Sequence, residues 1–100
     1  VPSGPFRIWY PNGIPQSEGF FREGIEDGVW TLWFENGKKR EMKIFEEGVM
    51  EGPYAWWHSN GQFRAEGIYE NGKKEGIWIL YDKFGKQEKC LTYSNGELVD

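Results

Sequence analysis

Glycine recurs at intervals of 24 residues along the whole chain, and this period constrains the fold more than any other feature. Three columns of four glycines each have this spacing. The other two glycines, Gly19 and Gly67, are 48 residues apart and share a fourth column, so no glycine lies outside the pattern. A fixed period of this length is typical of repeat proteins. The three full columns are Gly4, Gly28, Gly52 and Gly76; Gly13, Gly37, Gly61 and Gly85; and Gly24, Gly48, Gly72 and Gly96.

This period divides the chain into four units, residues 4–27, 28–51, 52–75 and 76–99. We expect one repeat domain over residues 1–100, which could be a fragment of a longer array. The terminal strands around Phe6 and Leu98 show no evident cap, so edge-to-edge self-association is a further expectation.

Aromatic residues follow the same period, and within each unit the pattern alternates as in a strand. Trp30 and Leu32 fall on one face, and Val29 and Trp33 on the other. The chain is 18% aromatic but polar overall, so rings must supply most of the buried area. The ring columns are Phe6, Trp30, Tyr54 and Trp78; Trp9, Trp33, Trp57 and Tyr81; and Phe21, Phe45, Tyr69 and Tyr93.

Turn signals separate the strands. Asn-Gly, at 12–13, 36–37, 60–61, 71–72 and 95–96, predicts two-residue type I′ turns. Glu23-Gly24, Glu47-Gly48 and Phe84-Gly85 occupy the other turn positions, and we expect three-residue loops there because Glu and Phe tolerate positive φ poorly. The predicted fold is therefore all-β: a single elongated, twisted antiparallel meander of about 8–9 strands built from four 24-residue β-hairpin repeats, on the order of 40 Å long.

The predicted register gives a role to the first glycine of each unit. If Asn36-Gly37 closes a two-residue loop, Phe45 lies opposite Gly28. We predict that the aromatic ring near the end of each unit packs over the backbone of such a glycine and fills the space that a side chain would otherwise occupy. The structural residues are then Gly4, Gly28, Gly52, Gly76, Phe21, Phe45, Tyr69 and Tyr93.

Charge and composition exclude several classes of partner. A net charge of −4 disfavours nucleic acid and acidic lipid. No apolar run approaches the roughly 20 residues of a membrane-spanning helix, so a membrane partner is not expected. The single cysteine allows no internal disulfide, which leaves the compartment open, with a cytoplasmic location slightly preferred.

Catalytic and metal-binding patterns are not evident. His58 and Cys90 fall in different units, so we interpret both as packing or surface residues rather than a nucleophilic pair. One His and one Cys are too few for a zinc site. No glycine cluster matches a phosphate-binding loop. We expect no enzymatic activity, no cofactor and no metal.

The segment "YENGKKEGIWILY" (69–81) resembles the MORN repeat, and the 24-residue form with "NGK" is similar to the variant MORN repeat of bacterial proteins. The resemblance covers all four units. It implies a fold of β-hairpins, and it also implies an antitoxin-like role in a toxin–antitoxin module. The acidic segments "FFREGIED" (20–27) and "IFEEGVME" (44–51) depart from the lysine-containing pattern.

The two faces of the predicted sheet differ. We assign the packed side to the face with Phe6, Trp30, Tyr54 and Trp78. The other face carries a ladder of rings, and the two-residue register places Arg40 and Arg64 opposite two of them. This ladder is either a second small core or an exposed partner-binding strip, since Trp, Tyr and Arg concentrate interface energy. The candidate partner-binding residues are Trp9, Trp33, Trp57, Tyr81, Arg40 and Arg64.

These observations predict a non-enzymatic protein-binding repeat module, with a toxin as the partner that the resemblance implies. A basic toxin would suit the acidic surface. Two alternatives stay open: a carbohydrate- or cell-wall-binding aromatic array, and a lipid-associated MORN scaffold.

Overall fold

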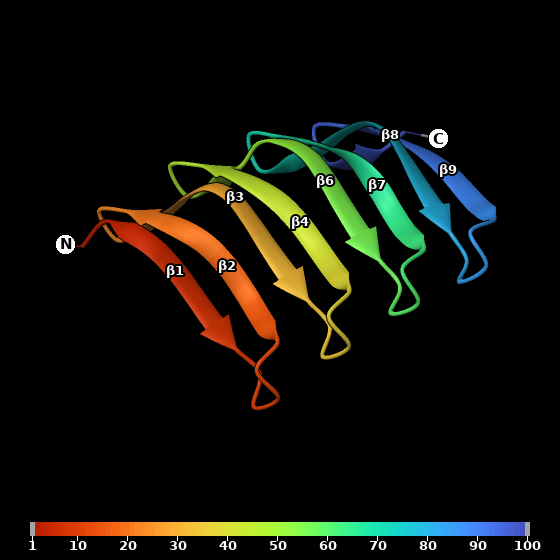
Figure 1. Cartoon of the computed structure of the whole chain (residues 1–100). Helices are drawn as coiled ribbons and strands as arrows, with labels where there is room; N and C mark the ends of the chain where they lie inside the picture. Colours follow the sequence, from red (N-terminus) through yellow and green to blue (C-terminus); the bar gives the residue numbers. More distant parts are fainter. Residues whose placement is uncertain (1, 100) are drawn as a thin grey trace.

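The structure, a computed structural model, describes residues 2–99 and consists of one open antiparallel sheet. The strands follow chain order across the sheet (Figure 1), with β5 and β6 together occupying one strand position beside β4. The strands are β1 (Gly4–Trp9), β2 (Pro15–Arg22), β3 (Ile25–Trp33), β4 (Lys39–Glu46), β5 (Val49–Met50), β6 (Gly52–Trp57), β7 (Phe63–Glu70), β8 (Lys73–Tyr81), β9 (Gln87–Ser94) and β10 (Glu97–Leu98).

The predicted fold class is confirmed. The sheet is a meander of hairpins and extends 42 × 31 × 12 Å, so the expected length of about 40 Å is also correct. Within residues 2–99 there is no helix long and apolar enough to cross a membrane.

Three-residue loops close the hairpins at one margin of the sheet. In the second hairpin the Gly37 N–H donates to the Phe34 carbonyl, and the Phe34 N–H donates to the Lys38 carbonyl. Of the three residues in this loop, only Gly37 has positive φ. A type I′ turn needs positive φ at both central residues, so Asn36 and Gly37 do not form one. The prediction of two-residue turns at 12–13, 36–37 and 60–61 was therefore wrong, whereas the three-residue loop at Phe84-Gly85 is confirmed.

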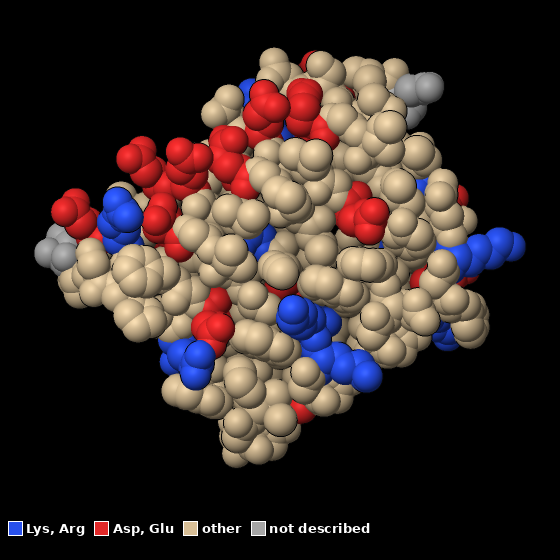
Figure 2. Space-filling view, turned by 45° about the horizontal axis from the view of Figure 1, so that its top comes forward, with Lys and Arg blue, Asp and Glu red and all other residues tan. Residues whose placement is uncertain are grey.

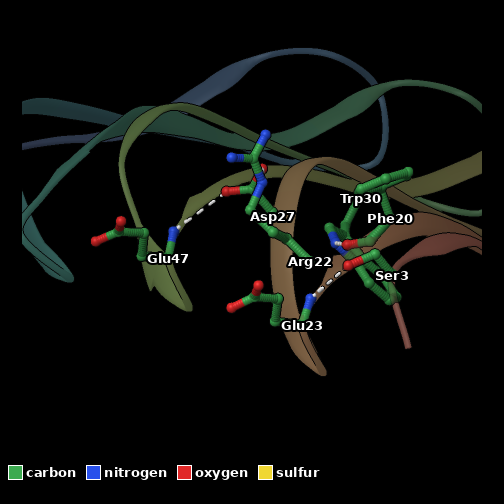
Figure 3. Close-up of polar contacts among 7 residues, drawn as sticks. All are labelled: Ser3, Phe20, Arg22, Glu23, Asp27, Trp30 and Glu47. Carbon is green, nitrogen blue, oxygen red and sulfur yellow. Dashed lines mark hydrogen bonds and ion pairs between the residues drawn. The ribbon is translucent and has the colours of Figure 1, made fainter. Parts of the chain in front are cut away.

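Two-residue turns with positive φ at both residues close the opposite margin. The prediction is confirmed at 71–72 and 95–96 but was wrong for Glu23-Gly24 and Glu47-Gly48, where both glutamates have a φ of 51°. In both glutamate turns the glutamate N–H donates to a side chain 20 residues earlier in the sequence (Figure 3): the Glu47 N–H donates to the Asp27 carboxylate at 3.3 Å, and the Glu23 N–H donates to the Ser3 hydroxyl at 2.8 Å.

The pairing register breaks once beside each three-residue loop. In the β3–β4 hairpin, Gly28 lies opposite Phe45 as predicted, and Leu32 lies opposite Glu41. Trp33 then pairs with Lys39, which leaves Arg40 as the extra residue of a bulge. The three-residue loop adds one residue to the hairpin, and the bulge absorbs it.

Rings on one face form two aromatic clusters. Trp30 is 6% exposed, and Trp78 is 3% exposed. Edge contacts surround each indole: the Trp30 and Phe21 ring centres are 5.1 Å apart, as are those of Trp78 and Tyr69. This face is the packed side, as predicted. The first cluster contains Phe6, Phe21, Trp30 and Phe45, and the second contains Tyr54, Tyr69, Trp78 and Tyr93.

The glycines that seat rings are not the ones predicted. A Cβ added at Gly28 or Gly76 would meet nothing within 4 Å, so no ring fills that space. Gly76 instead has a φ of 72°, and it lies where the pairing of β7 with β8 is interrupted. The ring seats are Gly19 and Gly67, whose added Cβ atoms would come within 2.1 and 2.2 Å of an indole ring.

Candidate functional site

An apolar row crosses the face opposite the aromatic clusters. Its members are cross-strand neighbours: Val29 pairs with Ile44, and Pro53 pairs with Ile68. Because side chains alternate along a strand, each row residue adjoins a cluster ring in the sequence. Val29 is 53% exposed, Ile68 52% and Ile77 61%, so large aliphatic side chains on three strands of this face are open to solvent. We define the apolar row as Phe20, Val29, Ile44, Pro53, Ile68 and Ile77.

The middle of the row lines a groove of about 550 Å³, here called the apolar groove. Met42, Ala55, Phe63 and Ile79 complete its walls toward the three-residue loops. The volume is within the range of roughly 300–1,000 Å³ found for ligand pockets. The groove can therefore accept several apolar atoms, and it offers few polar groups.

One carboxylate lies in this groove. Glu66 on β7 has Ala55 opposite it on β6 and Ile79 opposite it on β8. It is partly buried, and within residues 2–99 it forms no ion pair. Partial burial, and secondly the charge of Glu66, raise the pKa of Tyr81 above its ordinary value. Among the described residues, Glu66 is thus a carboxylate without an ion-pair partner, in an apolar setting.

The predicted ring ladder lies on the same face, beside the groove and toward the three-residue loops. Trp9 is 55% exposed, whereas Trp33, Trp57 and Tyr81 are partly buried. The rings of Trp57 and Phe63 stack with centres 5.3 Å apart and planes 23° apart. The ladder therefore has both an exposed and a packed part, because Trp9 is exposed and Trp57 is stacked on Phe63.

Arg40 and Arg64 do not join this ladder, and their predicted positions were wrong. The Arg64 guanidinium lies 4.0 Å from the centre of the Trp56 ring, which projects from the face opposite Trp57. Arg40 lies 5.8 Å from the Phe34 ring centre. Both arginines are bulge residues, so the strict alternation that was used to place them does not apply.

The two margins of the sheet carry opposite charge. Figure 2 shows acidic side chains gathered along one margin. The two-residue turns at this margin contain Glu23 and Glu47, and Glu46 ends β4 directly before its turn. The three-residue loops and the strands beside them carry Lys38, Lys39, Lys83, Lys86 and Lys89. The apolar row lies nearer the acidic margin, since Ile44 is close in sequence to Glu46 and Glu47. A partner on this face would meet apolar side chains bordered by negative charge.

His58 and Cys90 take separate places. A His58 ring nitrogen lies 3.0 Å from the Tyr81 carbonyl oxygen, and the Tyr10 hydroxyl, one repeat pair earlier, donates to the Trp33 carbonyl at 2.6 Å. Cys90 is exposed on β9. Among residues 2–99 no three His, Cys, Asp or Glu side chains lie together in a way that could hold a metal ion.

The sequence analysis did not predict the groove, because it considered the aromatic and glycine columns and not the aliphatic ones. A signal was present: positions 29, 53 and 77 contain Val, Pro and Ile, and positions 20, 44 and 68 contain Phe, Ile and Ile. Both columns are spaced by 24 and lie on the ladder face. Glu66 gave no signal, because its isolation depends on which residues face it across two strand pairs.

The repeated hairpins, the continuous sheet and the apolar groove define a β-hairpin repeat protein with one open apolar face. Comparison with protein families matches the MORN repeat variant at residues 2–23, 26–47 and 50–71. The chain therefore belongs to the family of MORN repeat variants, as the resemblance predicted. A search of curated proteins found no match. MORN repeats are consistent with a binding repeat module.

Proposed function

We propose that this chain is a non-enzymatic protein-binding module whose apolar groove receives an apolar segment of a partner protein. The observation that carries the proposal is the exposure of Val29, Ile68 and Ile77, which all line the same groove. Contiguous exposed apolar surface of this kind marks interaction sites. Covering it contributes about 25 cal/mol per Å² of apolar area removed from water.

The charge of the adjacent margin favours a partner with a basic surface. Glu46 and Glu47 extend beside the row, and complementary charge speeds association and selects among partners. A toxin protein with a basic surface fits this description, and we propose it as the partner, with the chain acting as its antitoxin or immunity protein. The support for that finer role is the acidic margin together with the resemblance to variant MORN repeats.

The two alternatives have less support. A sugar-binding array needs open ring faces on which sugars can stack, and Trp57 is already stacked on Phe63. A scaffold on acidic lipid needs a basic contact surface, and the chain has a net charge of −4. The aliphatic groove therefore favours protein over carbohydrate or lipid.

The test is loss of partner binding when charge is placed in the groove. The double variant Ile68→Glu/Ile77→Glu and the wild type serve as baits, and a partner captured only by the wild type is purified and titrated directly. We expect at least tenfold weaker binding by the variant. Phe84→Glu is the matched control, because Phe84 is 80% exposed on a loop outside the groove lining. Equal affinity of all three proteins would contradict the proposal.

The antitoxin role has its own test. The protein encoded by the adjacent reading frame is expressed with and without this chain, and growth of the host cell is measured. We expect growth to be lost without the chain, restored by the wild type and not restored by Ile68→Glu/Ile77→Glu. A neighbour that is harmless on its own would overturn the toxin assignment and leave the protein-binding proposal in place.

A further inference from the structure

We infer that the segment bound in the apolar groove carries a lysine or arginine that forms an ion pair with Glu66. This inference rests on the proposed function and specifies the chemistry of its partner. Glu66 lies between Ala55 and Ile79 in the cross-strand register, in a groove whose other lining residues are almost all apolar. A carboxylate that loses water on complex formation needs a compensating charge or hydrogen bonds.

The first unit shows how the same position is neutralised within the chain. Glu18 occupies the position equivalent to Glu66 two repeat units earlier. It forms an ion pair with Arg7, its neighbour across the β1–β2 hairpin. In the third unit Ala55 stands in the place of Arg7. The cation is absent there and the anion is kept, while the small side chain of Ala55 leaves room in the groove. A cation supplied from outside would restore the arrangement of the first unit.

Neighbouring groups favour a cation at this point. The rings of Phe63 and Tyr81 lie 6.3 Å apart beside the groove, and aromatic faces attract ammonium and guanidinium groups. Glu46 and Glu47 follow Ile44 of the apolar row closely in the sequence and add negative charge at that margin. The segment that fits is therefore amphipathic: apolar side chains on the row, one cation at Glu66 and a basic character overall.

The experiment uses a display library of random 12-residue peptides, selected on the purified full chain. The wild type is expected to enrich apolar sequences with a Lys or Arg at a constant position relative to the apolar residues. The best peptide is then titrated against Glu66→Gln and Glu18→Gln. Both substitutions remove one charge at the same repeat position, but the Glu18 carboxylate is already paired with Arg7. We expect about tenfold weaker binding for Glu66→Gln and unchanged binding for Glu18→Gln.

A second variant tests the inference by supplying the cation from within. Ala55→Arg places a guanidinium opposite Glu66, as Arg7 lies opposite Glu18. We expect it to reduce binding of the basic peptide at least tenfold. As a further check, replacing the peptide's cation by norleucine should weaken binding to the wild type and leave binding to Glu66→Gln unchanged. Circular dichroism and tryptophan fluorescence establish that each variant is folded.

The outcomes separate the inference from the proposed function. If the wild type enriches apolar peptides without a constant cation, or if Glu66→Gln binds them as tightly as the wild type, the ion pair is overturned and the groove remains a peptide-binding site. If no peptide is enriched and the captured partner also binds Ile68→Glu/Ile77→Glu normally, the groove itself is overturned. Selection of acidic peptides, or dependence on Glu18, would overturn the assigned charge.

Discussion

The indole of Trp78 occupies the space in which a side chain at Gly67 would lie: a Cβ added there would come within 2.2 Å of the ring. The same relationship joins Trp30 to Gly19 at 2.1 Å. Each indole N–H also donates to a backbone carbonyl at 3.2 Å, from Trp30 to Phe20 and from Trp78 to Ile68. These contacts hold the two most deeply buried rings of the described residues against bare backbone.

The Gly67→Ala substitution should destabilise the protein by about 3 kcal/mol, because the buried ring of Trp78 cannot move away without loss of packing. Urea unfolding followed by tryptophan fluorescence measures this change. Gly76→Asn is the control: the space at Gly76 is open and its φ is 72°, which Asn tolerates, so we expect a loss of about 1 kcal/mol or less. Equal losses would show that ring contact does not set the requirement at Gly67.

The Glu47→Asn substitution should stabilise the protein by about 1 kcal/mol, because Glu47 has a φ of 51° and Asn adopts the left-handed region at lower cost. The reciprocal change Asn71→Glu, at the equivalent turn position, should destabilise by a similar amount. Glu46→Gln removes a neighbouring charge at ordinary φ and should change stability by less than about 0.5 kcal/mol. The measurement is the urea midpoint at fixed ionic strength. A stabilisation equal to that of Glu46→Gln would assign the effect to charge instead.

The Asn36→Ala substitution should cost about 1 kcal/mol. The Asn36 amide donates to the Ser59 carbonyl of the next loop at 2.8 Å and accepts from the Lys38 N–H at 2.9 Å. Phe84 occupies the same loop position in the last unit and is 80% exposed, so Phe84→Ala should change the unfolding free energy by less than about 0.5 kcal/mol. Thermal unfolding by circular dichroism distinguishes the two, and a neutral Asn36→Ala would mean that the inter-loop bonds contribute nothing to stability.

Tyr54 should make stability depend on alkaline pH. Burial, followed by its hydrogen bond to Glu41, raises the pKa of Tyr54 above the ordinary value of 10.0. The unfolded chain therefore loses this proton before the folded chain does, and the associated stability is present below pH 10 and is lost as the pH rises above it. We expect Tyr54→Phe to be less stable than the wild type at pH 8, with a smaller further loss between pH 9 and about 11.5.

The alkaline experiment measures the unfolding free energy in urea at each pH, with tyrosine ionisation followed by absorbance. Tyr10→Phe is the control, because the Tyr10 hydroxyl donates to a backbone carbonyl, that of Trp33, rather than to a carboxylate. It should keep the wild-type pH dependence above pH 9. If Tyr54→Phe and the wild type lose stability in parallel, the Tyr54–Glu41 contact does not link ionisation to folding.

The sequence predicted part of the register for a reason that lies within each hairpin. Gly28 faces Phe45 because two different hairpin closures give the same pairing at this point. A two-residue loop gives it directly, and a three-residue loop gives it once the bulge has absorbed the extra residue. Arg40 shows the limit of that reasoning, because only the bulge decides on which face it lies. The turn types failed similarly: Asn36 was interpreted as a turn former, but it hydrogen-bonds the following loop, a contact that a single hairpin does not contain.

By itself the sequence determined the 24-residue period, the alternation of each strand and the meander of hairpins, because these follow from spacing along the chain and from local backbone preference. Only the tertiary structure decided which glycines lie beneath the indoles, which turns accept glutamate at positive φ, and that Glu66 has Ala55 and Ile79 as its cross-strand neighbours. Those features depend on contacts between strands and units, where the free energy of a side chain is set by its neighbours across the sheet.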